Sequence, residues 1–92
     1  MNYASWSETS RRDLRRAFEY YRLLDGELAL PIVGTIEAKA AWLADYPGTG
    51  APFRRRLRKS LVAGTPYLIP YQEETGGIAI IRVRHAAENW HP

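Results

Sequence analysis

Arginines in two separate stretches of the sequence are the residues best suited to do chemistry. Arg56 and Arg58 alternate in one stretch, and Arg82 and Arg84 alternate in the other. Residues two apart in a β-strand point to the same face, so each pair can present two guanidinium groups together. Guanidinium groups bind carboxylates and phosphates through paired hydrogen bonds. If both stretches belong to one sheet, the spacing predicts an anion-binding face; the alternative is a solvated polar face balanced by neighbouring acids.

Other residues with chemical potential carry weaker signals. His85 is the one histidine away from the end of the chain, and nothing near it in the sequence orients it as a general base. Tyr67 and Tyr71 are interpreted as packing groups, because a tyrosine hydroxyl is a poor acid at neutral pH. The glycine-rich loop at 48–50 lacks the Gly-Lys-Ser/Thr ending of a phosphate-binding loop. The chain has no cysteine and no metal-ligand spacing, so we expect neither a metal nor a cofactor.

The strands that must position these arginines lie in the last third of the chain. Residues 66–72 are aromatic and aliphatic, and residues 78–85 are largely β-branched, which favours strands. Paired glycines between them supply the positive φ angles of a hairpin turn. We therefore predict a β-hairpin over residues 66–85, with Pro70 marking either a gap in the ladder or a bulge.

Alternation along these strands assigns their side chains to two faces. Arginine is rarely buried without a partner, so Arg82 and Arg84 are expected on the open side. The helices should then cover the opposite face, which consists of Ala79, Ile81, Val83 and His85. Residues 53–61 alternate in the same way and predict a strand whose basic face holds Arg54, Arg56 and Arg58. A helical extension is the alternative there, because Arg, Leu and Lys favour helices.

Two helices are predicted ahead of these strands, after a short strand at residues 3–6. The first helix is expected to begin at Ser10, which with Asp13 has the capping-box spacing, and to end at Leu24. Gly26 would then supply a left-handed cap at its end.

The second helix is expected to begin near Glu27 or Leu28, so that Pro31 falls in its first turn, where the missing N–H costs little. The short link makes the two helices an antiparallel hairpin. Residues 47–52 are predicted as a loop. The element order is β-α-α-β-β-β, which describes an α+β fold with a mainly antiparallel sheet covered on one face by a two-helix hairpin.

Length and charge bound the kind of protein. The 92 residues are expected to form one domain, 1–92. No apolar run approaches the roughly 20 residues of a membrane helix, and the first residues lack a secretory-signal pattern, which favours the cytoplasm. Residues 1–53 carry a formal charge of −1 and residues 54–92 carry +4. The basic second half suits an acidic partner, either nucleic acid or a negatively charged protein.

Several short motifs, in this order and spacing, resemble the ParE/RelE toxin superfamily. The polar turn into the first helix ends in Asp13-Leu14, and Pro47 and Gly50 follow the second helix. The similarity continues through Arg58, Pro66-Tyr67, Tyr71 and Ile80-Ile81-Arg82-Val83-Arg84-His85, and ends at Glu88-Asn89-Trp90. The last stretch is most similar to the ParE branch.

The resemblance implies a toxin of a bacterial type II toxin–antitoxin pair. A ParE-like toxin would inhibit DNA gyrase without catalysis and be neutralised by a ParD-like antitoxin. One alternative is a RelE-like endonuclease that cuts mRNA on the ribosome, with Arg58, Arg82 and His85 as its catalytic residues. Another is a protein that keeps the fold and only binds its partner. Under the gyrase reading, the expected target-binding residues are Arg56, Arg58, Arg82, Arg84 and Trp90.

A partner surface is also expected, because antitoxins of such toxins fill an apolar groove with a helix or strand. Tyr20, Tyr21, Leu24 and Trp42 provide more aromatic and aliphatic area than two short helices need for their own packing. We therefore predict that some of these four side chains are exposed in the free chain and covered in the complex.

Overall fold

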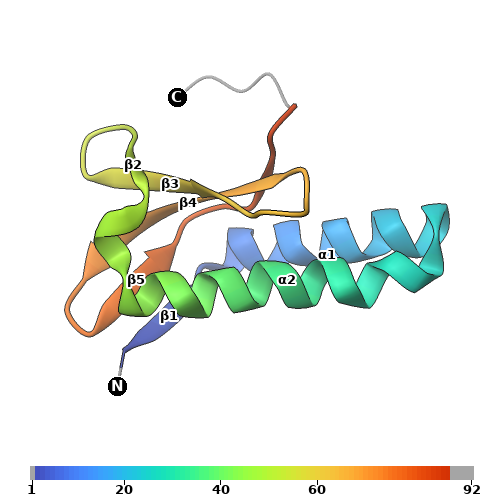
Figure 1. The fold of residues 1–92 in the computed structure, drawn as a ribbon, viewed down its shortest axis with the longest axis horizontal. Helices are drawn as coiled ribbons and strands as arrows, with labels where there is room; N and C mark the ends of the chain where they lie inside the picture. Colours follow the sequence, from blue (N-terminus) through green and yellow to red (C-terminus); the bar gives the residue numbers. More distant parts are fainter. Residues whose placement is uncertain (1, 88–92) are drawn as a thin grey trace.

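The computed structural model describes residues 2–87 and shows two helices packed against one face of a sheet (Figure 1). The expected α+β fold is confirmed, with a short additional strand and a last strand that is divided in two. The elements are β1 (Tyr3–Trp6), α1 (Glu8–Leu24), α2 (Gly26–Asp45), the 3-10 turn η1 (Pro47–Thr49), β2 (Ala51–Pro52), β3 (Leu57–Leu61), β4 (Tyr67–Glu74), β5 (Gly77–Ile80) and β6 (Arg84–His85).

The sheet has the order β1-β5-β4-β3-β2, with β6 beside β4. All neighbouring strands are antiparallel except β1 and β5, which are parallel. The core lies between the sheet and the helices, and α2 contacts β1 and β5 directly. Its fully buried side chains include Ile36 and Leu43 from α2 and Ile69, Tyr71 and Ile78 from the sheet. The helices extend beyond the sheet, so the turn that joins them lies apart from it (Figure 1).

Helix α1 is capped by Ser7, so the predicted start at Ser10 is wrong. The Ser7 hydroxyl accepts a hydrogen bond from the Ser10 N–H at 3.0 Å, and Ser10 lies fully buried in the first turn. The polar run before the helix offers two serines as caps. The sheet selects the earlier one, because the Ser7 N–H donates to the Ile80 carbonyl and its hydroxyl donates to the Ile81 carbonyl.

Asp25 forms the whole junction between the two helices. Its N–H donates to the Tyr21 carbonyl, and its carboxylate accepts from the Glu27 N–H. Gly26 is therefore the first residue of α2, and its predicted left-handed cap is wrong because α1 ends at Asp25, whose backbone is extended and whose N–H caps the helix. The helix also starts one residue before the predicted range. Pro31 consequently lies in the second turn of α2 rather than the first, where it removes one backbone hydrogen bond.

The strand predicted over residues 53–61 is confirmed for β3 and wrong for the residues before it. Ala51–Pro52, expected as loop, forms β2, and a tight turn joins it to β3. In that turn the Leu57 N–H donates to the Arg54 carbonyl, and Arg55 has a positive φ of 49°. The helical alternative is therefore wrong as well. The turn ends the strict alternation, so Arg54, Arg56 and Arg58 do not form one strand face.

Pro70 lies inside β4 without interrupting it, and the irregularity falls on the neighbouring strand. Tyr71 pairs with Ile80, whereas Leu68 pairs with Arg84. Two residues of β4 therefore face the three residues 81–83, which is a β-bulge. The Pro70 carbonyl accepts from the Ile81 N–H at 3.0 Å, but proline has no N–H to donate in return. A bulge is therefore present, but on the strand opposite Pro70 and not on the strand of Pro70 where it was expected. The Ile81 carbonyl that Pro70 cannot bind accepts a hydrogen bond from the Ser7 hydroxyl instead.

The bulge overturns the face assignment made from alternation. Ile78 and Ile80 are fully buried under the helices, whereas Ala79 and Ile81 are partly exposed. The assignment is therefore wrong for this part of the strand, because it assumed an unbroken two-residue period through residues 78–85. Val83, expected on the covered face, is buried as predicted.

Candidate functional site

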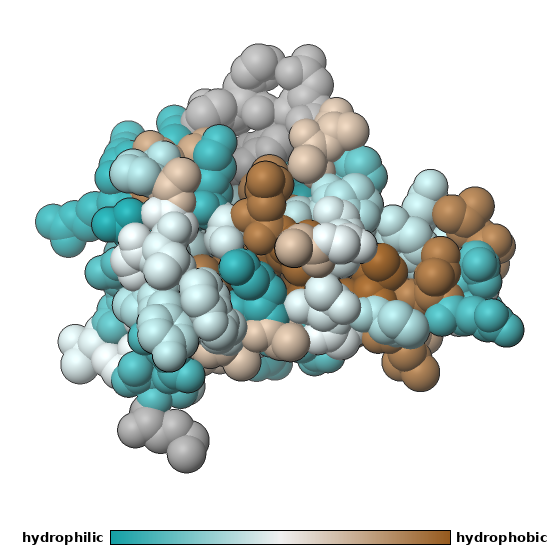
Figure 2. All heavy atoms as spheres, viewed as in Figure 1, coloured by the Kyte–Doolittle hydropathy of each residue, from teal (hydrophilic) through white to brown (hydrophobic). Residues whose placement is uncertain are grey.

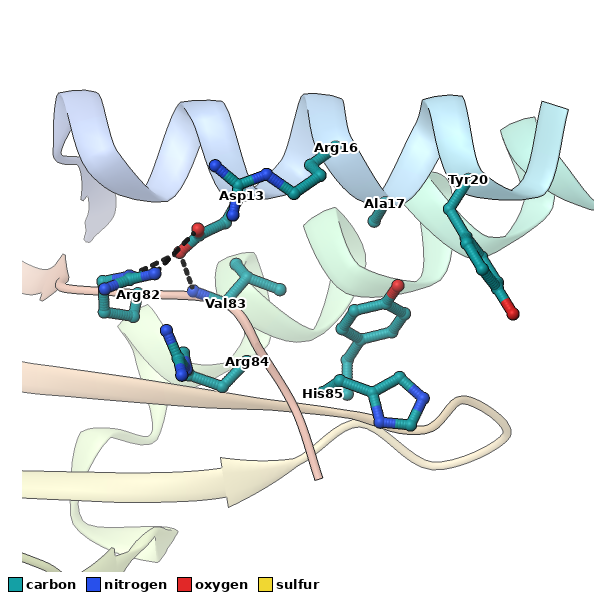
Figure 3. Close-up of a pocket in the computed structure, with 9 residues that line it drawn as sticks. Asp13, Arg16, Ala17, Tyr20, Arg82, Val83, Arg84 and His85 are labelled. Atoms are coloured by element: carbon teal, nitrogen blue, oxygen red, sulfur yellow. Dashed lines mark hydrogen bonds and ion pairs between the residues drawn. The ribbon is translucent and has the colours of Figure 1, made fainter. Parts of the chain in front are cut away.

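A pocket of about 260 Å³ lies between α1 and residues 82–85. We call it the α1 pocket (Figure 3). In Figure 3 the guanidinium groups of Arg16, Arg82 and Arg84 lie toward the Asp13 end, whereas Tyr20 and His85 lie toward the other. Its lining consists of Asp13, Arg16, Ala17, Tyr20, Tyr67, Arg82, Val83, Arg84 and His85.

Asp13 anchors the bulge to α1. Its side chain is only 5% exposed, and it accepts hydrogen bonds from Arg82 Nε at 2.7 Å, from Arg82 Nη2 at 3.1 Å and from the Val83 N–H at 2.9 Å. Burial of a carboxylate costs free energy unless the group is paired and hydrogen-bonded, so the fold requires this ion pair. Sequence reasoning missed it by treating Asp13 as a capping residue. The signal was its position one turn before Ala17, which places a carboxylate on the buried stripe of the helix.

The remaining charge in the α1 pocket is positive. Three guanidinium groups and one carboxylate line it, and the Asp13 carboxylate is taken up by Arg82. Arg16 is exposed and forms no ion pair with any residue between 2 and 87. In His85, Nδ1 accepts a hydrogen bond from the Ala87 N–H at 3.1 Å, and the ring packs edge-on against Tyr67. No side chain among these contacts orients the imidazole as a general base.

Arg56 and Arg58 line a second pocket, which we call the β3 pocket. Its lining consists of Pro52, Arg55, Arg56, Leu57, Arg58, Gln72 and Glu73. Arg58 donates to the Gly50 carbonyl at 2.8 Å and lies 3.3 Å from a Glu73 carboxylate oxygen. The expected single surface of four arginines is therefore wrong, because Arg82 and Arg84 line the α1 pocket instead. Arg58 also lies in a different pocket from Arg82 and His85, and Trp90 lies outside the described residues.

Tyr71 secures the chain beside the β3 pocket. Its hydroxyl donates to the Pro47 carbonyl at 2.6 Å and accepts from the Gly50 N–H at 3.0 Å. The side chain is fully buried, as its interpretation as a packing group requires, and burial raises the pKa of the phenol. Gly50 is needed here because a Cβ at that position would collide with the Tyr71 ring.

Large apolar side chains are exposed on the helices. Of the four residues expected at the partner surface, Tyr20, Leu24 and Trp42 are exposed and Tyr21 is buried, which agrees with the prediction that some of the four are exposed in the free chain. Sequence reasoning missed the other members of the surface, because a turn between helices was treated as a connection only. Leu23 and Leu30 are 77% and 73% exposed at that turn. Figure 2 shows hydrophobic residues gathered at the end of the molecule where Figure 1 places the turn.

The described residues offer neither a metal site nor a helix that could cross a membrane. Within 2–87, no cluster of three or more His, Cys, Asp or Glu side chains could hold a metal ion. Neither α1 nor α2 combines the length and apolar character of a membrane-crossing helix.

Comparison with known proteins gives matches over nearly the whole chain. Residues 4–90 match the family described as "ParE toxin of type II toxin-antitoxin system, parDE". The candidate toxin Y4kP of Sinorhizobium fredii (strain NBRC 101917 / NGR234) is 33% identical over 86 residues, which cover 92% of this chain and 88% of that protein. A solved structure titled "Chromosomal ParDE TA system from P. aeruginosa" superposes with a TM-score of 0.81 at 25% identity, covering 92% of this chain and 96% of the other.

Proposed function

This chain belongs to the ParE toxin family of type II toxin–antitoxin systems, and from that premise we propose that it inhibits DNA gyrase in the cytoplasm and is neutralised by a ParD-like antitoxin. The match of residues 4–90 to the family carries the proposal. It spans both helices, the sheet and both arginine pockets, so it is not the likeness of one motif.

The antitoxin is proposed to cover the exposed apolar side chains of the helices. Tyr20 and Leu24 lie on α1, and Leu23 and Leu30 extend the surface around the turn into α2. An exposed apolar surface of this kind is typical of a protein-binding site. The similarity to a solved structure titled as a ParDE system supports a ParD-like partner. Trp42, stacked on Tyr46 and beside the Lys39 ammonium, is proposed as a further contact.

The target is proposed to bind at the β3 pocket. Arg54, Arg55 and Arg56 are all exposed on the turn that enters β3, and Arg58 follows them. Four guanidinium groups on one turn and the strand after it suit an acidic surface of a protein. Of the residues expected to bind the target, Arg56 and Arg58 are retained here, and Trp90 stays a prediction outside the described residues. Arg82 forms an ion pair with Asp13 and is therefore not assigned to the target.

Gyrase inhibition is preferred to RNA cleavage on chemical grounds. Cleavage requires one group to take the 2′-hydroxyl proton and others to stabilise the charged phosphate. The three residues that the nuclease alternative would use are divided between two pockets, and Nδ1 of His85 already accepts a backbone hydrogen bond. Inhibition by binding requires no proton transfer from the toxin.

The proposal is tested with purified toxin in two assays, DNA supercoiling by gyrase and mRNA integrity on translating ribosomes. We expect loss of supercoiling with intact mRNA, an inhibition that weakens in Arg56→Glu and persists in His85→Ala. Normal supercoiling with codon-spaced mRNA cuts that disappear in His85→Ala would overturn the gyrase proposal and establish the nuclease alternative. A chain inactive in both assays that still binds antitoxin would be a partner-binding protein without toxicity.

A further inference from the structure

The α1 pocket continues into the apolar surface along one side of α1. Arg16 lies at the pocket, Tyr20 lies one helical turn further on, and Leu23 and Leu24 lie one turn beyond that. Side chains three and four positions apart are neighbours on a helix surface, so these four form one exposed stripe. The stripe is cationic at the pocket and apolar at the turn between the helices. A segment that lies along it needs an acid at one end and apolar residues at the other.

The floor of the α1 pocket favours a compact planar anion beside an apolar group. Ala17 and Val83 are 4% exposed and Tyr67 is 8% exposed, so the floor is apolar and already packed. Arg16, which is exposed, stands at its rim, Arg84 also lines it, and Arg82 is held in place by Asp13. A guanidinium matches a carboxylate by two parallel hydrogen bonds, and the apolar surroundings strengthen them.

From these observations we propose that the α1 pocket binds a carboxylate side chain of the antitoxin, whose following residues lie along Tyr20, Leu23 and Leu24. This inference rests on the proposed function, because it names the chemistry by which the antitoxin is recognised. The occupant is a protein segment and not a nucleic acid, because a phosphate backbone has nothing to place against the exposed leucines. The α1 pocket is therefore distinct in function from the β3 pocket, to which the target is assigned.

The test compares two charge reversals on α1 in the full-length toxin. Arg16→Glu removes the rim cation, and exposure of Arg16 without an ion pair within residues 2–87 makes the change compatible with folding. Arg15→Glu is the matched control, because Arg15 is also exposed but lines a different pocket with Leu14 and Phe18. The probe is the purified antitoxin encoded beside the toxin gene. Titration calorimetry gives its affinity, and thermal melts confirm that each variant is folded.

We expect Arg16→Glu to weaken antitoxin binding at least ~10-fold, because a like charge replaces an attractive one, and Arg15→Glu to change it less than ~2-fold. An antitoxin in which one acid is changed to lysine should restore binding to Arg16→Glu, and Arg84→Lys, which keeps the charge, should bind within a few-fold of wild type.

Equal affinities of Arg16→Glu and wild type would overturn the inference. So would unchanged antitoxin binding combined with lost affinity for a 12-nucleotide single-stranded DNA, measured by fluorescence anisotropy, since the anion would then be a phosphate. A wild-type toxin that does not bind the antitoxin at all would instead refute the proposed function, and this inference with it.

Discussion

Arg82 and Arg58 are the same residue type in the same kind of sequence pattern, yet the structure uses them differently. Both side chains are about one-third exposed, and both contact a carboxylate. The partner of Arg82 is Asp13, which is 5% exposed and lies at 2.7 Å, whereas the partner of Arg58 is Glu73, which is 49% exposed and lies at 3.3 Å. Burial of the partner, rather than the arginine itself, makes one contact structural and the other a surface contact.

This difference matters for function because the two pockets place their arginines in different surroundings. In the α1 pocket one arginine is held by a buried acid of the fold, and Arg16 lies exposed beside an apolar floor. In the β3 pocket Arg55 and Arg56 stand on an exposed turn, and the lining is more polar than that of the α1 pocket. An apolar floor favours a protein segment that is partly buried on binding, and an exposed basic turn favours a broad acidic surface.

The largest expected effect follows from breaking the buried contact. Asp13→Ala leaves the Arg82 guanidinium and the Val83 N–H without their acceptor, so we expect a loss of about 3 kcal/mol in the free energy of unfolding. Urea denaturation measures it. Glu8→Ala, which removes an exposed partner of Arg12, is the control and should cost less than about 1 kcal/mol. Equal losses in both variants would show that burial does not distinguish these pairs.

A smaller effect is expected beside the β3 pocket, where a neutral hydroxyl and not a charge secures the chain. Tyr71→Phe removes the donor to the Pro47 carbonyl and the acceptor for the Gly50 N–H. Leaving these groups without partners should cost about 2 kcal/mol, measured in the same denaturation experiment. A neutral result would mean that water replaces the hydroxyl and that the corner is not fixed by Tyr71.

The contribution of Tyr71 to stability should also depend on alkaline pH. Burial raises the pKa of Tyr71 above the ordinary value of about 10 that it has in the unfolded chain. The unfolded chain therefore loses the proton first, so the contribution of Tyr71 to stability is complete below about pH 10 and is lost as the pH rises through the folded-state pKa. Denaturation midpoints across this range should fall more steeply for wild type than for Tyr71→Phe. Parallel curves would contradict the assignment.

The smallest effect is expected from Glu73→Ala. Its ion pair with Arg58 is exposed on the Glu73 side, and such pairs contribute less than about 1 kcal/mol. Arg58→Ala should cost more than Glu73→Ala, because it also removes the donor to the Gly50 carbonyl. If the two variants lose the same stability, the carbonyl contact contributes nothing measurable. Thermal melts at low and high salt separate the ionic part, which alone is screened.

The sequence was sufficient to predict the helices and strands, but not to predict which face of the sheet each side chain occupies. Local composition predicted the hairpin and both helices, because aromatic, β-branched and amphipathic patterns act within a few residues. The face that carries Arg82 depends on one extra residue opposite Pro70, and the partner that completes the bulge, Ser7, lies far away in the chain. Pro70 indicated that a ladder bond would be missing. It could not indicate which strand would carry the additional residue.

Prediction of the site from the sequence was limited by the same long-range effect. The exposure of Tyr20 and Leu24 could be predicted because excess apolar area on a short helix has nowhere to be buried. The division of the arginines into two pockets could not, because it follows from the register beyond the bulge and from the carboxylate of Asp13. An acid on the buried stripe of a helix was the available signal, since it requires a cation or N–H group from elsewhere in the fold.

The most direct test of the two-pocket account is gyrase supercoiling with purified toxin, with and without antitoxin, for wild type, Arg16→Glu and Arg56→Glu. We predict that Arg16→Glu inhibits gyrase as wild type does and that relief of the inhibition requires at least ~10-fold more antitoxin. We predict that Arg56→Glu inhibits weakly while its affinity for antitoxin is unchanged. If both variants lose the same property, whether inhibition or relief by antitoxin, the separation of target and antitoxin between the two pockets is contradicted.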